Sequence, residues 1–281
     1  MRLQELKALL EAYGLVPQAR FGQNFLTDPA LLTVIPKDAG VQPGERVIEI
    51  GPGAGALTER LLEAGALVSA VELDYGLIRL LRDRFPDALA EKRLELIEGD
   101  ALGPAESLHP ALEKRWDAEA ALGRPPRLVA NLPYSISGPF LARLPSRPLA
   151  GATLLLQREV AVKVAGPAGG EWSPLALRLT LAFEVELGRR VPAEVFWPRP
   201  QVESCFLHLH PRAQALAPAR EALLAAALRE AFGQRRKSLL PRFDRDQPQW
   251  AAALRDAGVA ARARPGEIGP EIWSIALSRI Q

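Results

Sequence analysis

Apolar residues recur along the chain in patterns that alternate between helix and strand. A helix is predicted over 3–13 because five large apolar side chains share one face: Leu3, Leu6, Leu9, Leu10 and Tyr13. From residue 46 onward, short apolar runs typical of buried strands are separated by helical patterns. Strands are expected at 46–50, 67–71, 94–97, 127–130 and 152–156. This alternation predicts an α/β fold with a doubly wound, mostly parallel sheet.

Two later strand patterns, at 183–191 and 203–210, have no helical pattern between them. We therefore expect an antiparallel hairpin that completes a mixed, seven-stranded sheet. Beyond Pro211 the pattern changes to Ala/Leu-rich helix. The chain thus predicts a first domain over 1–211, which includes the amino-terminal helix and the stretch 20–26, and a small all-α domain over 212–281. The stretch 20–26 mixes polar and aromatic residues too irregularly for a helix or a strand.

Composition narrows the class of protein. Of the 281 residues, 48% are hydrophobic, yet no apolar run approaches a membrane span and the amino terminus lacks a signal-peptide pattern. A soluble cytoplasmic protein without a membrane partner is expected. The one cysteine, Cys205, lies in a strand-like run and is expected to fill the core, so neither an internal disulfide nor a metal site is predicted.

Charge is spread unevenly along the chain. Residues 1–184 carry 20 Lys and Arg against 23 Asp and Glu, whereas residues 185–281 carry 15 against 10. The basic excess near the carboxyl end indicates a polyanionic partner.

Candidate chemistry lies in the tetrad Asn131-Leu132-Pro133-Tyr134, directly after the strand at 127–130. Open α/β sheets bind ligands at the carboxyl ends of their strands. The Asn131 amide oxygen and the Leu132 carbonyl can accept both hydrogens of a planar exocyclic amine, and Tyr134 offers a face on which a base can stack. Two such acceptors would draw the delocalised lone pair of the amine toward an electrophile. Taken alone, the tetrad is equally compatible with a polar turn that caps a strand.

A glycine-rich turn lies between the first strand and helix of the alternation, where backbone amides can approach a ligand closely. Its Gly51, Gly53 and Ala56 also satisfy a loose dinucleotide fingerprint, so the turn alone leaves NAD open. Close packing of helix on strand would require the same glycines.

Carboxylates separate the two cofactors. Glu72 follows the second strand at the position where a partner for the ribose hydroxyls belongs. Asp100 ends the third strand and Glu49 precedes the glycine turn. Acidic walls favour a ligand without phosphates, such as S-adenosylmethionine (SAM), over NAD.

Six segments in order resemble the KsgA (RsmA) family of ribosomal RNA adenine dimethyltransferases: 21–26, 49–53, 131–137, 157–161, 196–204 and 231–239. The resemblance implies a Rossmann-like class I SAM-dependent methyltransferase with a small helical RNA-binding domain. It implies catalytic roles for Asn131, Leu132, Pro133 and Tyr134. It also implies cofactor contacts at Asn24, Leu26, Gly51, Gly53, Glu72, Asp100, Ala101 and Asn131.

The resemblance further implies that Phe196 faces Tyr134 across a flipped adenine, with ordinary core packing as the alternative. It implies that Arg235, Arg236 and Lys237 contact RNA phosphates, and a solvated helix end is the alternative there.

Two places depart from the family pattern. Trp172 and Pro174 stand in one, and Leu240-Pro241 in the other. Both are expected on an RNA-facing surface, so the RNA contacts at these positions are left open.

The function implied by the resemblance is transfer of SAM methyl groups to adenine N6. The implied product is N6,N6-dimethyladenosine at two adjacent positions in the 3′-terminal hairpin loop of small-subunit (16S) rRNA. Such a monomeric enzyme would act within 30S particles during ribosome biogenesis. The alternatives are an Erm-type 23S rRNA adenine N6-methyltransferase, a ribosome-assembly factor with secondary methyl transfer, and an NAD oxidoreductase.

Overall fold

The computed structural model describes residues 1–167, 170–213 and 216–280, and the chain packs into two compact units. The first comprises Met1–Arg143, Pro148–Ala161 and Glu186–His210. The second comprises Leu144–Arg147, Val162–Val185 and the chain from Pro211 onward. Packing thus adds earlier segments to the helical carboxyl-terminal part. The division into domains at 211 and 212 stays a prediction.

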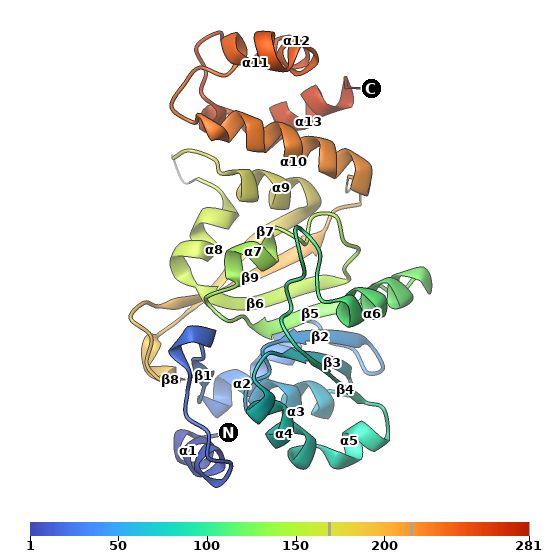
Figure 1. Ribbon diagram of the computed structural model, residues 1–281, viewed down its shortest axis with the longest axis vertical. Helices are drawn as coiled ribbons and strands as arrows, with labels where there is room; N and C mark the ends of the chain where they lie inside the picture. Colours follow the sequence, from blue (N-terminus) through green and yellow to red (C-terminus); the bar gives the residue numbers. More distant parts are fainter. Residues whose placement is uncertain (168–169, 214–215, 281) are drawn as a thin grey trace. The chain divides into compact units, whose positions relative to one another are not determined.

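A seven-stranded sheet runs through the first unit (Figure 1). Its strands are β2 (Arg46–Ile50), β3 (Leu67–Glu72), β4 (Leu94–Glu98), β5 (Arg127–Asn131), β6 (Gly151–Gln157), β7 (Phe183–Val191) and β9 (Ser204–Pro211). They lie in the order β4-β3-β2-β5-β6-β9-β7. The five strands from β4 to β6 pair in parallel, and β9 pairs antiparallel with β6. The mostly parallel seven-stranded sheet is confirmed, and β9 and β7 are neighbours at its end, as expected of a hairpin.

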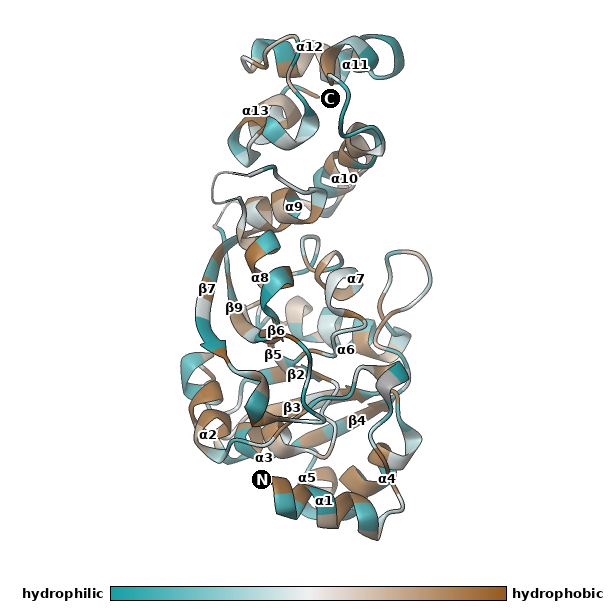
Figure 2. Cartoon of the chain, turned by 90° about the vertical axis from the view of Figure 1, so that its left-hand side faces the viewer, coloured by the Kyte–Doolittle hydropathy of each residue, from teal (hydrophilic) through white to brown (hydrophobic). Residues whose placement is uncertain are grey.

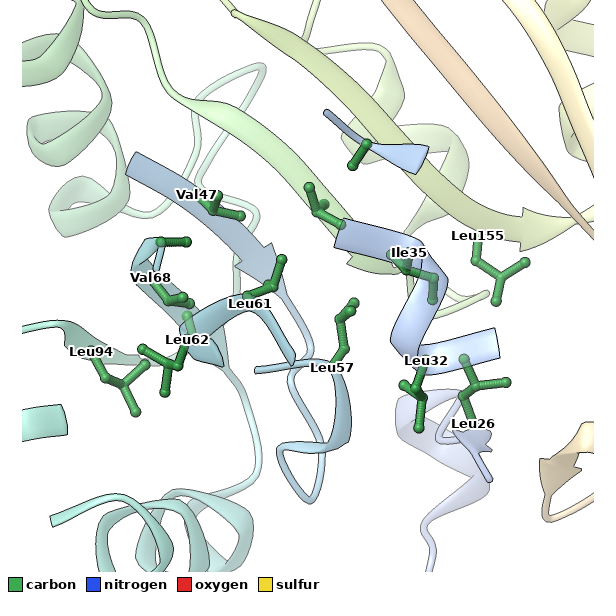
Figure 3. Close-up of a cluster of buried hydrophobic side chains, with 14 of the residues drawn as sticks. Leu26, Leu32, Ile35, Val47, Leu57, Leu61, Leu62, Val68, Leu94 and Leu155 are labelled. Carbon is green, nitrogen blue, oxygen red and sulfur yellow. The ribbon is translucent and has the colours of Figure 1, made fainter. Parts of the chain in front are cut away.

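Helices make up most of the rest of the first unit. They are α1 (Leu3–Ala12), α2 (Pro29–Asp38), α3 (Ala56–Glu63), α4 (Tyr75–Arg84), α5 (Pro86–Ala90), α6 (Pro110–Ala121) and α7 (Ser137–Leu141). Leu32 and Ile35 of α2 and Leu61 of α3 join Val47 and Val68 of the sheet in one buried cluster (Figure 3). Removing these side chains from water fixes the strands whose carboxyl ends carry the candidate chemistry.

A second, two-stranded sheet pairs β1 (Phe25–Leu26) antiparallel with β8 (Phe196–Trp197). The expectation that 20–26 forms neither helix nor strand is therefore wrong. The segment contains the end of a 3₁₀ turn, Ala19–Phe21, followed by β1. Each strand is only two residues long and its partner lies far away in the sequence, so neither produces a periodic pattern.

Helices make up most of the second unit: α9 (Pro174–Ala182), α10 (Pro218–Gly233), α11 (Leu240–Asp246), α12 (Pro248–Asp256) and α13 (Pro270–Ser278). The helix α8 (Arg158–Ala165) begins in the first unit and ends in the second. Brown and teal residues are mixed along these helices (Figure 2), and apolar residues from them form a second buried core. Trp250 and Trp273 meet in the core with their ring centroids 5.8 Å apart.

Two positions that depart from the family pattern contribute to this core. Leu240 is buried, and Trp172 packs against the core and donates its backbone N–H to Gly266. Burial stabilises the side chain of Leu240, which corrects the expected exposure there. Trp172 is only partly buried, and a contact with RNA at this residue stays a prediction. No helix in the described ranges is both long and apolar enough to cross a membrane.

Candidate active site

A cavity of about 370 Å³ opens at the carboxyl ends of β2, β3, β4 and β5. The loops after these strands meet there because parallel strands end at the same edge of a sheet. The amino-terminal segment from Arg20 to Leu26 lines it as well. The structure brings together every cofactor residue expected from the sequence: Asn24, Leu26, Gly51, Gly53, Glu72, Asp100, Ala101 and Asn131. Leu132, Pro133 and Tyr134 also line the cavity.

The turn after β2 has a backbone that favours glycine. Gly51 has a φ of 69° and Gly53 a φ of 59°, both in the left-handed region. A Cβ on Gly51 would lie 2.8 Å from Cγ of Pro133, and one on Gly53 would lie 2.9 Å from the ring of Phe25. Both glycines are therefore required by close approach, which places the turn against the tetrad and against β1.

Glu72 presents a buried carboxylate at the end of β3. Its two oxygens accept the backbone N–H groups of Gly53 (3.1 Å) and Asp74 (2.9 Å). Burial raises the pKa of Glu72, although these N–H groups oppose the shift. The carboxylate thus ties the glycine turn to β3.

Glu49, one residue before the end of β2, is only 1% exposed. Its carboxylate accepts the hydroxyl of Thr58 at 2.7 Å. Burial raises the pKa of Glu49 to about 8, and the nearby charge of Glu72 adds to the effect. Neither Glu49 nor Glu72 forms an ion pair with a described residue, although both lie beside one cavity. A cationic ligand would offset the cost of ionising these buried acids.

The loop after β4 contributes a different environment. Asp100 is exposed, and its Oδ1 accepts the backbone N–H of Leu102 at 2.9 Å. Ala101 beside it is buried. This side chain interaction shapes the loop and keeps the Asp100 carboxylate at the cavity wall.

The tetrad holds its amide in one orientation. Nδ2 of Asn131 donates to the backbone carbonyl of Asn24 at 2.9 Å. Because a carbonyl only accepts, Nδ2 must face Asn24, which leaves Oδ1 of Asn131 as an acceptor for a ligand. The partnership between Asn24 and Asn131 joins two segments that the sequence identified separately.

Tyr134 is fixed through its hydroxyl. Its Oη lies 2.6 Å from Oγ of Ser204, a fully buried residue at the start of β9. Burial raises the pKa of Tyr134, so the phenol stays neutral at physiological pH. The hydrogen bond fixes the direction of the ring that lines the cavity.

Phe196 does not line the cavity. Its ring is 3% exposed and belongs to the cluster that contains Leu26 and Leu32. The β1–β8 pairing places Phe196 opposite Leu26, on the core side of the small sheet. Phe196 is therefore packed in the core here, and its contact with a flipped adenine opposite Tyr134 stays a prediction.

Arg235, Arg236 and Lys237 belong to the second unit and follow α10 in a turn. All three side chains are exposed, and they form no ion pair with any described residue. They form a short cationic segment available to an anionic partner.

Comparison with known proteins decides the family. The model of the family described as "Ribosomal RNA adenine dimethylase" matches residues 17–268. The chain belongs to this family. Among relatives of this dimethylase, the "Ribosomal RNA small subunit methyltransferase A" of Anaeromyxobacter sp. (strain K) is 39% identical over 268 residues, which cover 94% of this chain and 92% of the relative. The protein of the same name in Prochlorococcus marinus (strain MIT 9303) is 39% identical and covers 90% of both chains.

Solved structures support the dimethylase fold. The 23S rRNA methyltransferase ErmE has a TM-score of 0.66 at 28% identity and covers 91% of this chain and 99% of its own. A dimethyladenosine transferase from Plasmodium falciparum has a TM-score of 0.66 at 24% identity and covers 90% and 95%. The resemblance to the KsgA (RsmA) family, the Rossmann-like methyltransferase fold and the assignment as a SAM-dependent enzyme are thereby confirmed.

The cavity of this dimethylase has a donor set that fits SAM. The Glu72 carboxylate can accept hydrogen bonds from the ribose hydroxyls of the cofactor. The positive charge of the cofactor suits a cavity with two buried acidic residues, Glu49 and Glu72. No group of three or more His, Cys, Asp or Glu side chains in the described part of the chain is arranged to hold a metal ion.

Sequence reasoning missed some residues that support the site. Gln18, Gln23 and Asp74 form a hydrogen-bonded cluster beside it, and Ser204 anchors Tyr134. The one available signal was Asp74 directly before a helical pattern, which is typical of a helix N-cap. Nothing in the pattern connects that cap with the glutamines.

Proposed function

We propose that this protein dimethylates N6 of two adjacent adenosines in the 3′-terminal hairpin loop of 16S rRNA, within 30S particles during ribosome biogenesis. The description of the family indicates adenine in ribosomal RNA as the target. Relatives named for the small ribosomal subunit are 39% identical to this chain. The observation that carries the proposal is the fixed amide of Asn131, with Oδ1 free to accept, beside Tyr134 at an acidic cavity. We further propose that the protein acts as a monomer in the cytoplasm.

Residues from the amino-terminal segment and from the carboxyl ends of β2, β3, β4 and β5 would hold the cofactor. Glu72 would accept the ribose hydroxyls, and Asp100 would accept a hydrogen bond from the adenine amine of SAM. When bound, SAM supplies an electrophilic methyl group on a positively charged sulfur. The remaining contacts would come from Asn24, Leu26, Gly51, Gly53, Ala101 and Asn131, which line the same cavity.

The tetrad would orient the target base. Oδ1 of Asn131 and the Leu132 carbonyl would accept the two hydrogens of N6, and Tyr134 would stack on the ring. Pro133 lies against Gly51 and so positions the tetrad over the glycine turn. Since N6 becomes acidic as its new bond to carbon forms, its proton can leave to water. Positioning then supplies most of the rate.

The target base must leave its stack to enter such a site, and this costs least in a loop. Phe196 would contact the second face of the base only after its ring leaves the buried cluster. Arg235, Arg236 and Lys237 would contact phosphates of the RNA, consistent with their exposure.

The experiment uses unmethylated 30S and 50S subunits, each incubated with the protein and tritiated SAM, followed by nucleoside analysis. We expect N6,N6-dimethyladenosine in the 30S sample only. Asn131→Ala should reduce labelling to background while SAM binding, measured by calorimetry, stays detectable. Near-normal labelling by this variant would contradict the orienting role.

The second candidate is 23S rRNA methylation, which the similarity to ErmE favours. Labelling confined to the 50S sample would establish that candidate and overturn the proposal. Labelling of neither subunit would leave both without support.

A further inference from the structure

Two glutamines of the amino-terminal segment bind one carboxylate at the end of β3. Gln18 and Gln23 each donate from Nε2 to Oδ2 of Asp74, both at 3.1 Å. The other oxygen, Oδ1, accepts the backbone N–H groups of Gly76 (2.9 Å) and Leu77 (3.4 Å) and so caps α4. Asp74 is 8% exposed. We call Gln18, Gln23 and Asp74 the Asp74 cluster.

The orientation of both glutamine amides in the Asp74 cluster is fixed by further hydrogen bonds. The backbone N–H of Gln18 donates to Oε1 of Gln23 at 2.8 Å, so Nε2 of Gln23 must face the carboxylate. Likewise, Nε of Arg20 donates to Oε1 of Gln18 at 2.9 Å. Turning either amide would lose both of its hydrogen bonds and bring like groups together, so the carboxylate is the acceptor that both glutamines require.

The cluster is connected to the tetrad through a single residue. Gln23 precedes Asn24, and the carbonyl of Asn24 accepts Nδ2 of Asn131. On its other side, the backbone N–H of Asp74 donates to Glu72. The same carboxylate therefore lies between the proposed cofactor carboxylate and the segment that orients the proposed catalytic amide.

We propose that the Asp74 cluster positions the Asn24 carbonyl and thereby holds the Asn131 amide with Oδ1 toward the substrate amine. Its members are positioning residues, since they act through Asn24. The inference rests on the proposed function, because the orientation of Asn131 matters only if that amide binds the reacting base. A displacement of about 1 Å remote from the chemistry can cost up to about a hundredfold in rate.

The test replaces one acceptor and keeps the helix cap. In Asp74→Asn the side chain oxygen can still cap α4, because Asn and Asp are equally good N-caps. The introduced NH₂ group, however, cannot accept from either glutamine. Asp28→Asn is the matched control, since Asp28 caps α2 through Ala30 and Leu31 (2.9 and 3.1 Å) and has no glutamine partner among the described residues.

Both variants are assayed as full-length protein with unmethylated 30S subunits at saturating SAM. We expect Asp74→Asn to lower kcat at least about tenfold and to change KM for 30S less than about threefold, whereas Asp28→Asn stays close to wild type. A merely structural defect would lower the active fraction, and with it the denaturation midpoint, whereas loss of the positioning role lowers kcat at an unchanged midpoint. Both midpoints are therefore measured by circular dichroism.

A charge-conserving double variant provides the rescue. In Asp74→Asn with Gln23→Glu, the carboxylate introduced at position 23 can accept from the backbone of Gln18 and from the new amide at position 74. The hydrogen bond is restored with reversed polarity, so we expect most of the lost kcat to return. Gln18→Ala, which removes one donor and leaves the cap intact, should give a smaller loss of the same kind.

Asp74→Asn with the kcat of Asp28→Asn would overturn the inference. So would a loss that appears only in KM, or a slow variant that the Gln23→Glu change does not improve. If the wild-type protein labels neither subunit, the proposed function fails and the inference fails with it. That outcome is distinct from active wild type with an unaffected variant.

Discussion

Burial of Glu49 predicts a pH dependence of stability that can be removed by one substitution. The pKa of this carboxyl is raised from 4.5 to about 8, chiefly by burial. Between these pH values the folded protein holds a proton that the unfolded chain has released. The free energy of unfolding therefore falls as pH rises through this window, and the stabilisation is fully present only below about pH 4.5.

The size of the effect follows from the two pKa values. At roughly 1.4 kcal/mol per pH unit, the interval from 4.5 to about 8 corresponds to about 5 kcal/mol. Glu49→Gln keeps the shape and an acceptor for Thr58 but cannot ionise. We therefore expect this variant to gain stability relative to wild type as pH rises, from within about 1 kcal/mol at pH 5 to several kcal/mol at pH 8.

The assay is urea unfolding of the cofactor-free protein at pH 5, 6, 7 and 8, followed by circular dichroism. Thr58→Val serves as a second variant: it removes the hydrogen bond that favours the ionised form, so the loss of stability should extend to higher pH. A difference between wild type and Glu49→Gln that stays constant from pH 5 to 8 would refute the reasoning. A difference in unfolding free energy that grows as the pH falls would show that the predicted direction of the effect is wrong.

Three further predictions concern packing, the glycine turn and the cationic segment. Phe196→Ala removes a buried ring and should cost roughly 3–5 kcal/mol in urea unfolding, whereas a loss under about 1 kcal/mol would contradict its burial. Gly51→Ala brings a methyl carbon to 2.8 Å from Pro133 and should weaken SAM binding in calorimetry. Gly44→Ala, also at positive φ but with nothing within 4 Å, should leave binding unchanged, and equal effects would exclude the steric explanation. Changing 235–237 to Gln should make the plot of log RNA-binding constant against log salt concentration less steep by about 2, without affecting SAM binding. An unchanged slope would favour a solvated helix end.

Sequence patterns predicted the strands and the loops that carry the site because both are local. The runs at 46–50 and 127–130 are mostly apolar, as is typical of buried parallel strands. The glycine turn and the tetrad follow these strands directly, so their meeting at one edge of the sheet could be inferred from topology alone.

Contacts between distant segments could not be inferred in this way. The hydrogen bond from Asn131 to Asn24, and that between Tyr134 and Ser204, join residues whose separation has no periodic signal. Phe196 shows the same limit, because its position in the core depends on pairing with Leu26. An aromatic side chain in a motif can either stack on a ligand or pack in the core, and only the strand with which it pairs decides between the two.

The pairing of β1 with β8 also affects how the protein is made. Residues 25 and 26 find their partners at 197 and 196, so the small sheet cannot form on a nascent chain before residue 197 has been translated. At about 5–20 residues per second, this leaves the amino-terminal segment without its partner strand for roughly 10–30 seconds. A chain that is released before residue 196 would lack both β9 of the large sheet and the strand that anchors Phe25 and Leu26 beside the cavity.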